Sequence, residues 1–179
     1  FPVTPFPVLD LIDTFGKSLR GRAPARIAVF ATRATVRSGA YGRTIRINVP
    51  GADVFEIEAP ALVPLVERGA AGTRVAQDAV DVLCRDLPPR LDAIVYGCTH
   101  YPLLDDAFAA ALGSRVERMD PAIAQAAATK ALLHARAMPG GTGTTHYLTN
   151  GDLGAFRRNV RSWTADARGT FADTRALTA

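Results

Sequence analysis

The chain has 179 residues, 48% of them hydrophobic and 21% charged, so it is long enough and apolar enough to bury a sizeable core. Its formal net charge is +4, but the basic side chains are dispersed and not interleaved with aromatic ones, so we expect no binding to nucleic acid. No apolar run is long enough to span a bilayer, and two cysteines are too few for a disulfide framework, so we expect no membrane contact and a reducing, cytoplasmic location.

Apolar residues recur along the chain with periods typical of helices and of strands. In chain order, the elements expected before residue 120 are a helix over 8–19, a strand over 27–30, a short helix over 36–41, strands over 45–49 and 54–55, helices over 62–67 and 73–87, a strand over 93–96, a helix over 103–111 and a strand over 116–119. The elements expected after it are a helix over 121–137, a Gly/Thr linker over 139–145, a strand over 146–149, a helix over 152–163 and a weak strand over 170–177.

This alternation of strands and helices is typical of βαβ units. It predicts an α/β fold in which a mostly parallel sheet is sandwiched by helices. Residues 1–118 supply enough elements for one complete α/β domain. Residues 119–179 supply only a few short strands and two helices, and their strands would leave unpaired edges. We therefore expect residues 119–179 to be the C-terminal part of an incomplete second domain.

The polar stretch over 97–102, Gly-Cys-Thr-His-Tyr-Pro, lies between a buried strand and the helix that follows it. In open α/β sheets, ligands bind at the carboxyl ends of the strands, so a thiol, a hydroxyl group and an imidazole at this place predict a functional site. Free amides at the start of the helix favour an anion there, and they can lower the pKa of the Cys98 thiol. The alternative is that Cys98 is a small buried residue at the end of a strand. Cys84 lies in an apolar helical pattern and is expected to pack in the core.

Several kinds of chemistry are disfavoured by residue spacing. A protease-like pair is disfavoured because His100 follows Cys98 by only two residues, whereas such pairs come from distant segments. The spacing of Cys98, His100 and His146 matches no metal site, so no metal is expected. Lys17 and Lys130 both lie in helical surface patterns, which disfavours a pyridoxal enzyme. What is left is a thiol that acts as an acid or base beside an imidazole.

The residues around Cys98 resemble a known family. The segment over 95–104, Val-Tyr-Gly-Cys-Thr-His-Tyr-Pro-Leu-Leu, is similar to the second cysteine motif of the glutamate racemases, within the aspartate/glutamate racemase family. Three other segments resemble that family in the same order along the chain: residues 32–41, residues 60–67, and residues 147–152 followed by Phe156 and Trp163. Ala31 and Ala59 stand where the family has a glycine and a cysteine.

The resemblance implies a cofactor-independent isomerase that interconverts L- and D-glutamate and supplies D-glutamate for peptidoglycan, and hence for the cell wall and cell shape. In such an enzyme, one thiol removes the α-proton and a second thiol returns a proton on the opposite face. Cys98 would be one of the two acid/base groups, and His100 would orient or polarise it. Glu67 would be the partner of His100 behind the site.

The same resemblance places Thr32, Thr35, Thr99 and His100 at the substrate, which would be the small molecule glutamate. It is compatible with a homodimer. The first half of the family carries Asp-Ser-Gly, Pro-Tyr-Gly and Cys-Asn-Thr-Ala segments, and none of these occurs in this sequence. We therefore expect the chain to lack the N-terminal half-domain and to be inactive alone, because removing one member of a catalytic pair abolishes the paired chemistry.

Two alternatives stay open at this point. A related racemase that acts on aspartate or a hydantoin would share the scaffold and the thiol pair. A catalytically inactive, truncated module would instead bind an acidic ligand through the loop that contains Cys98.

Overall fold

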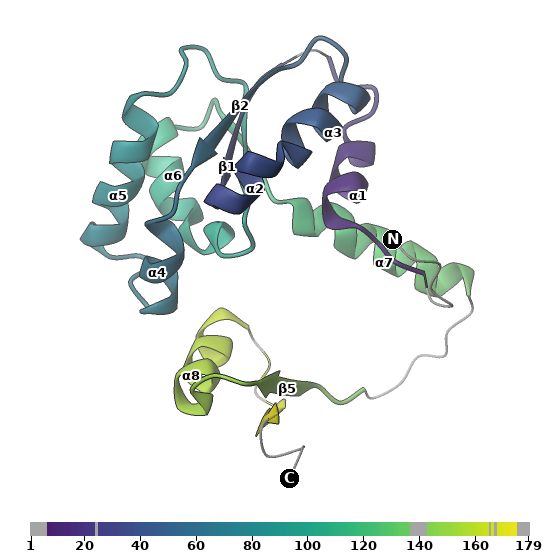
Figure 1. The fold of residues 1–179 in the computed structure, drawn as a ribbon, viewed down its shortest axis with the longest axis vertical. Coiled ribbons are helices and arrows are strands. Elements are labelled where there is room, and N and C mark those ends of the chain that lie inside the picture. Colours follow the sequence, from purple (N-terminus) through teal and green to yellow (C-terminus); the bar gives the residue numbers. More distant parts are fainter. Residues whose placement is uncertain (1–6, 24, 137–142, 165, 167, 175–179) are drawn as a thin grey trace. The chain divides into compact units, whose positions relative to one another are not determined.

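The computed structural model describes residues 7–23, 25–136, 143–164, 166 and 168–174. The chain divides into two compact units, residues 1–137 and residues 138–179. The first unit contains a four-stranded sheet in the order β2-β1-β3-β4 (Figure 1). Its strands are β1 (Arg26–Ala31), β2 (Asp53–Glu58), β3 (Ala93–Gly97) and β4 (Glu117–Met119), and every pairing between them is parallel.

Helices cover both faces of this sheet, which confirms the predicted α/β fold (Figure 1). One group comprises α1 (Leu11–Ser18), α2 (Arg33–Ser38), α3 (Ala40–Asn48) and α7 (Pro121–Ala135). The other comprises α4 (Leu62–Glu67), α5 (Arg74–Arg85), the 3-10 helix η1 (Tyr101–Leu104) and α6 (Asp105–Leu112).

The sheet is buried on both faces, as the continuous apolar runs of its central strands predicted. On one face, Phe15 of α1 and Val29 of β1 belong to the same apolar cluster. On the other face, the ring of Phe108 on α6 packs against the rings of Phe30 and Tyr96, at centroid distances of 5.0 and 5.4 Å. The helices packed on the two faces together hold the carboxyl ends of the strands in place.

The segment over 40–49 differs from its prediction, because α3 replaces the expected strand. Gly39 adopts a left-handed conformation with φ of 60°, which ends α2 and lets α3 begin at the next residue. Tyr41, Ile45 and Val49 are four residues apart, and each is at most 2% exposed. Ile47 is 74% exposed, although the apparent alternation of apolar residues placed it on the same face as Ile45.

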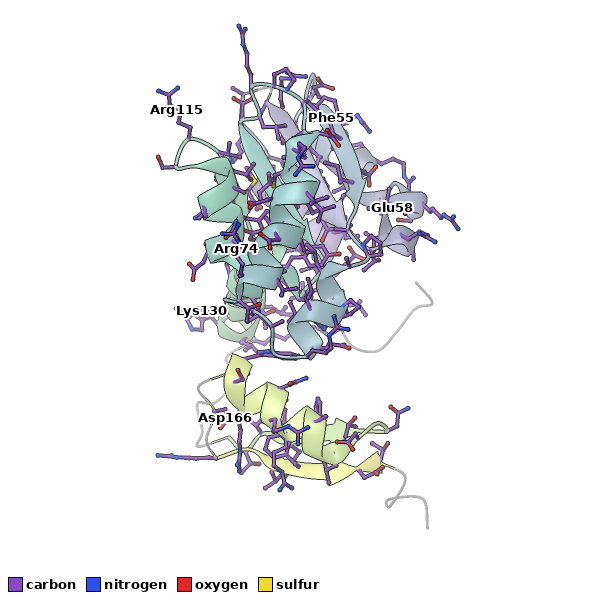
Figure 2. All side chains as sticks on the ribbon, turned by 90° about the vertical axis from the view of Figure 1, so that its left-hand side faces the viewer. Phe55, Glu58, Arg74, Arg115, Lys130 and Asp166 are labelled. Carbon is purple, nitrogen blue, oxygen red and sulfur yellow. The ribbon has the colours of Figure 1, made fainter. Side chains whose placement is uncertain are left out.

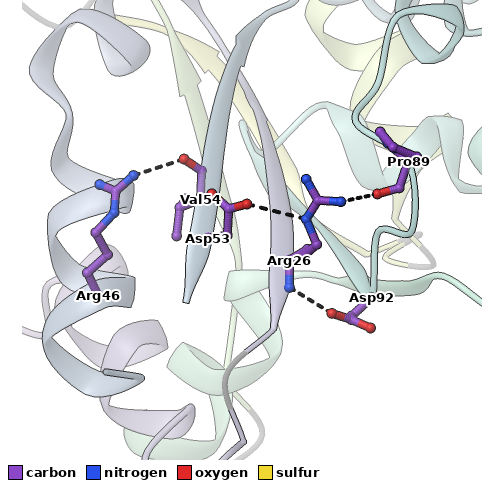
Figure 3. Close-up of polar contacts among 6 residues, drawn as sticks. All are labelled: Arg26, Arg46, Asp53, Val54, Pro89 and Asp92. Atoms are coloured by element: carbon purple, nitrogen blue, oxygen red, sulfur yellow. Dashed lines mark hydrogen bonds and ion pairs between the residues drawn. The ribbon is translucent and has the colours of Figure 1, made fainter. Parts of the chain in front are cut away.

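Arg26, the first residue of β1, connects segments that meet at the amino end of the sheet (Figure 3). Its backbone N–H donates to Asp92 at 2.7 Å, and its guanidinium group contacts Asp53 at 3.3 Å and the carbonyl group of Pro89. Arg46 of α3 donates to the carbonyl oxygen of Val54 on β2 at 2.9 Å. These contacts tie β1 and β2 to each other, to α3 and to the loop that precedes β3, at the end opposite Cys98.

The boundary between the two units falls at 137/138, whereas the sequence pattern placed it at 118/119. The reason is that α7 packs against α1 within the first unit, where the side chain of Gln125 donates to the carbonyl oxygen of Leu9 at 2.9 Å. The Asp120 carboxylate caps α7 as expected, accepting from the N–H of Ala122 at 2.9 Å. Helix α7 ends at Ala135, and residue 137 lies outside the described residues.

The second unit is a βαβ arrangement of β5 (His146–Thr149), α8 (Leu153–Trp163) and β6 (Thr170–Asp173), whose two strands are parallel. The rings of Tyr147 and Phe171 stack at 5.0 Å between centroids. The guanidinium groups of Arg157 and Arg161 lie 5.4 and 6.0 Å from the centroid of the Phe171 ring, so this basic face of α8 is partly packed on an aromatic ring. The predicted linker over 139–145 and the end of the predicted strand over 170–177 lie partly outside the described residues.

The positive charge is spread over separate elements. Figure 2 shows Arg74 on α5, Arg115 in the loop before β4 and Lys130 on α7 at distinct places on the first unit. Within the residues that the structure describes, no helix combines the length and the apolar character needed to cross a membrane.

Candidate active site

The predicted site lies where β1 and β3 end. Thr32 directly follows β1 and Cys98 directly follows β3, and the last residues of these strands, Ala31 and Gly97, are register partners. Neighbouring parallel strands lie about 4.8 Å apart, so Thr32 and Cys98 leave the sheet side by side. Gly97 is required here, because a Cβ atom at this position would lie 2.9 Å from the Ala31 Cβ atom and 2.9 Å from the carbonyl oxygen of Phe30.

The Cys98 thiol is half-buried, and its Sγ atom lies 3.8 Å from the Nδ1 atom of His100. Burial raises the pKa of the Cys98 thiol, because a thiolate is poorly solvated there, and a hydrogen bond from the His100 backbone N–H offsets only part of that rise. An amide near the start of the helix does lower this pKa, as expected, but burial outweighs it and the net direction is upward. At neutral pH, Cys98 is a thiol that needs a base before it can accept a proton.

The other ring nitrogen of His100, Nε2, lies 3.4 Å from a carboxylate oxygen of Glu67, the last residue of α4. The side chain of His100 is 26% exposed. An ionised carboxylate can only accept hydrogen bonds, so Glu67 favours a proton on Nε2. Nδ1 of a neutral His100 is then free of a proton and directed at Cys98. The structure thus places Cys98, His100 and Glu67 in one line of contacts.

The two threonines predicted to frame the substrate lie together at the start of α2. Their hydroxyl oxygens, Oγ1 of Thr32 and Oγ1 of Thr35, are 3.0 Å apart. The backbone N–H of Thr35 donates to the Thr32 hydroxyl at 3.4 Å, so Thr32 also caps α2. Thr99 is exposed beside Cys98. The candidate site therefore presents hydroxyl groups from two neighbouring strand ends.

Sequence reasoning missed two buried tyrosines near this site. Burial raises the pKa of Tyr41 to about 12, with smaller contributions from Asp120, from the thiolate form of Cys98 and from Asp10. Tyr101 is 0% exposed and donates its hydroxyl proton to the carbonyl oxygen of Ala59 at 2.8 Å. The only indication of such a contact is chemical, because the hydroxyl group of a fully buried tyrosine requires a hydrogen-bond acceptor.

Cys84, the second cysteine of the chain, lies in α5 and is half-buried. Burial, with a smaller contribution from Asp81, raises the pKa of its thiol to about 11. Such a thiol is a poor source of thiolate at neutral pH. Among the described residues, no group of three or more His, Cys, Asp or Glu side chains is arranged to hold a metal ion.

No family model matches the chain. Its sequence is similar to that of the glutamate racemase of Desulforudis audaxviator, with 36% identity over 162 residues that cover 84% of this chain and 59% of the relative. It is also similar to the glutamate racemase of Gloeobacter violaceus, with 39% identity over 145 residues that cover 80% of this chain and 54% of the relative.

Solved structures agree with the sequence comparison. The glutamate racemase of Thermus thermophilus superposes with a TM-score of 0.76 and 30% identity, covering 91% of this chain and 60% of that one. The glutamate racemase isoform of Bacillus anthracis superposes with a TM-score of 0.83 and has the same fold at 20% identity, covering 95% of this chain and 65% of that one.

The chain spans 59% of the length of the Desulforudis audaxviator relative. The chain is therefore related in sequence and in fold to the glutamate racemases, over most of its own length and part of theirs.

Proposed function

We propose that the chain provides the Cys98 side of a glutamate racemase. The observation that carries this proposal is the line of contacts from the Cys98 Sγ atom to His100 Nδ1, at 3.8 Å, and from His100 Nε2 to Glu67, at 3.4 Å. Relatives with 36% and 39% identity are glutamate racemases, which supports the same reaction here. The chain matches 59% of the first relative's length. The proposal places the rest of the active site outside these residues.

The reaction moves one proton off the α-carbon of glutamate and one proton onto its opposite face. When Cys98 is the base, its S–H proton passes to Nδ1 of His100, and the thiolate then takes the α-proton. The imidazolium that forms is stabilised by the carboxylate of Glu67. When Cys98 is the acid, its S–H proton passes to the α-carbon and leaves a thiolate. Protons balance in both directions, and no cofactor takes part.

The opposite thiol is not Cys84, whose pKa of about 11 and place in α5 suit a packing role. We place the second thiol in a segment outside residues 1–179. The same segment would complete the domain to which β5, α8 and β6 contribute. The carboxylate and amino groups of the substrate would be bound at the strand ends by Thr32, Thr35, Thr99 and His100.

An amino acid as substrate is supported by the solved relatives. The Francisella tularensis glutamate racemase was solved in complex with D-glutamate, and the Thermus thermophilus enzyme with β-chloro-D-alanine. The corresponding role for this chain is to help supply D-glutamate for the cell wall, in the cytoplasm.

The test is a polarimetric assay with D-glutamate. The chain alone should show no racemisation. Addition of the part of the Desulforudis audaxviator relative that lies outside the match should give racemisation. The Cys98→Ser variant should abolish this activity, whereas Cys84→Ser should preserve it. Activity that persists in Cys98→Ser would contradict the proposal, and turnover of D-aspartate but not D-glutamate would reassign the substrate.

A further inference from the structure

Tyr101 connects two loops of the candidate site. It follows His100 directly, is the first residue of η1 and is 0% exposed. Its hydroxyl group donates to the carbonyl oxygen of Ala59 at 2.8 Å. Ala59 is also 0% exposed, and its N–H donates to the carbonyl oxygen of Ala31 at the end of β1, at 2.9 Å. The phenol is therefore bound to backbone that the sheet itself holds in place.

The same carbonyl oxygen marks the start of α4. It accepts a second hydrogen bond, of 3.2 Å, from the N–H of Leu62, the first residue of that helix. Leu62 and Val66 are both 0% exposed, so α4 is seated firmly in the core. Glu67 is the last residue of α4, and five helical steps of about 1.5 Å place it about 7.5 Å along the axis from Leu62. The place of Ala59 thus determines the place of Glu67.

The other end of the connection is the segment with Cys98 and His100. The N–H of Tyr101 donates to the carbonyl oxygen of Cys98 at 3.1 Å, and the N–H of Leu103 donates to that of His100 at 3.2 Å. These bonds form two overlapping turns over residues 98–103. Chain connections and non-covalent contacts together therefore form a closed ring. It runs from His100 through Tyr101, Ala59 and α4 to Glu67 and back to His100.

We propose that the Tyr101 hydroxyl group is a positioning group: by binding the Ala59 carbonyl, it holds Glu67 at Nε2 of His100 and keeps Nδ1 directed at Cys98. The inference rests on the proposed function, which gives the contact between His100 and Cys98 its purpose. Tyr101 itself exchanges no proton with the substrate. Its effect passes through the tautomer of His100, which can be measured in the 179-residue chain without any racemase activity.

The experiment records long-range ¹H–¹⁵N correlations of the histidine side chains in the ¹⁵N-labelled chain at about pH 8.5, above the reference pKa of histidine. We expect His100 to be predominantly the Nε2–H tautomer. Tyr101→Phe should convert it to a mixture, and Glu67→Ala should give the same mixture. His134 and His146 are internal controls, and their spectra should not change.

Tyr96→Phe is the matched control. Tyr96 is another buried tyrosine, 3% exposed, and its hydroxyl group donates to Asp105 at 2.6 Å rather than to Ala59. It should leave the His100 tautomer unchanged. A folded Tyr101→Phe chain with the wild-type tautomer would overturn the inference, as would an equal effect of Tyr96→Phe.

If Tyr101→Phe fails to fold, p-aminophenylalanine at position 101 retains an N–H donor at the same ring position. It should retain the Nε2–H tautomer, and loss of that tautomer in the folded variant would overturn the inference. These spectra do not depend on turnover, so failure of the racemisation assay and failure of this inference are separate results.

Discussion

The carboxylate of Asp105 binds the guanidinium group of Arg118 through two contacts, of 2.8 and 3.2 Å. Asp105 is the first residue of α6, and Arg118 lies on β4, so the pair joins the helix after the candidate site to the last strand of the sheet. The same carboxylate accepts the hydroxyl proton of Tyr96 at 2.6 Å. The start of α6 is thereby fixed to two adjacent strands.

This arrangement predicts a loss of stability in acid. The hydrogen bond from Arg118 holds the pKa of Asp105 below its usual range, against an opposing effect of burial and with help from Tyr96. A carboxyl group whose pKa is lowered in the folded state stabilises the fold at pH values above its unfolded pKa of about 3.9. This contribution is lost as the pH falls through the folded pKa. Asp105→Asn should lower the free energy of unfolding by about 1 kcal/mol at neutral pH and flatten its decline below about pH 4. Urea unfolding at a series of pH values measures both effects, and an unchanged acid slope would contradict this origin.

Replacement of Gly97 should destabilise the fold. The added Cβ atom of Gly97→Ala would meet the Ala31 Cβ atom and the Phe30 carbonyl oxygen at 2.9 Å, and neither can move without shifting β1. Overpacking of this kind costs about 1–3 kcal/mol. Gly143→Ala is the control, because nothing lies within 4 Å of a Cβ atom there. Denaturant midpoints compare the two variants, and equal midpoints would show that the sheet accommodates a methyl group.

Two isoleucines of α3 should differ sharply in their contribution to stability. Ile45 is 0% exposed and Ile47 is 74% exposed. Ile45→Ala should cost about 2–5 kcal/mol, whereas Ile47→Ala should change stability by less than about 0.5 kcal/mol. Because a strand over 45–49 would place both side chains on one face, similar costs in chemical unfolding would favour the strand over the helix.

The Cys98 thiol should react slowly with iodoacetamide at neutral pH, because burial raises its pKa and the thiolate is the reactive form. Its rate should rise with pH to a midpoint above the usual thiol pKa of about 8.5. The Cys84→Ser variant isolates this reaction, and mass spectrometry of the alkylated peptide measures it. Cys84, whose pKa is about 11, should titrate later in the matched Cys98→Ser variant. A midpoint for Cys98 below about pH 8 would argue against the burial described here.

Local patterns were sufficient for much of this fold. The continuous apolar runs of β1 and β3 and the Asp120 cap of α7 can be recognised from a few consecutive residues. Helix α3 was missed because Ile45, Ile47 and Val49 alternate like a strand, whereas the helical spacing only becomes visible when Tyr41 is included. Long-range packing decided between the strand period and the helical period of these apolar residues.

The candidate site divides in the same way. Cys98 and His100 lie in one short segment, so their proximity could be predicted. The approach of Glu67 to His100 came from the resemblance to a family, and the structure brings these two side chains to 3.4 Å. The contact between Tyr101 and Ala59 spans 42 positions, and no local pattern indicates which carbonyl group a buried phenol will reach. The chemical roles of these residues stay predictions.

The hydrogen bond from Arg46 to the carbonyl oxygen of Val54 affects how readily the sheet can pair with backbone of other molecules. β2 is an outer strand, and strands in that position tend to recruit backbone from other molecules. A guanidinium group anchored on α3 already occupies one of the acceptors that an incoming strand would use. Extension of the sheet into an aggregate through this border is therefore opposed by a side chain of the protein itself.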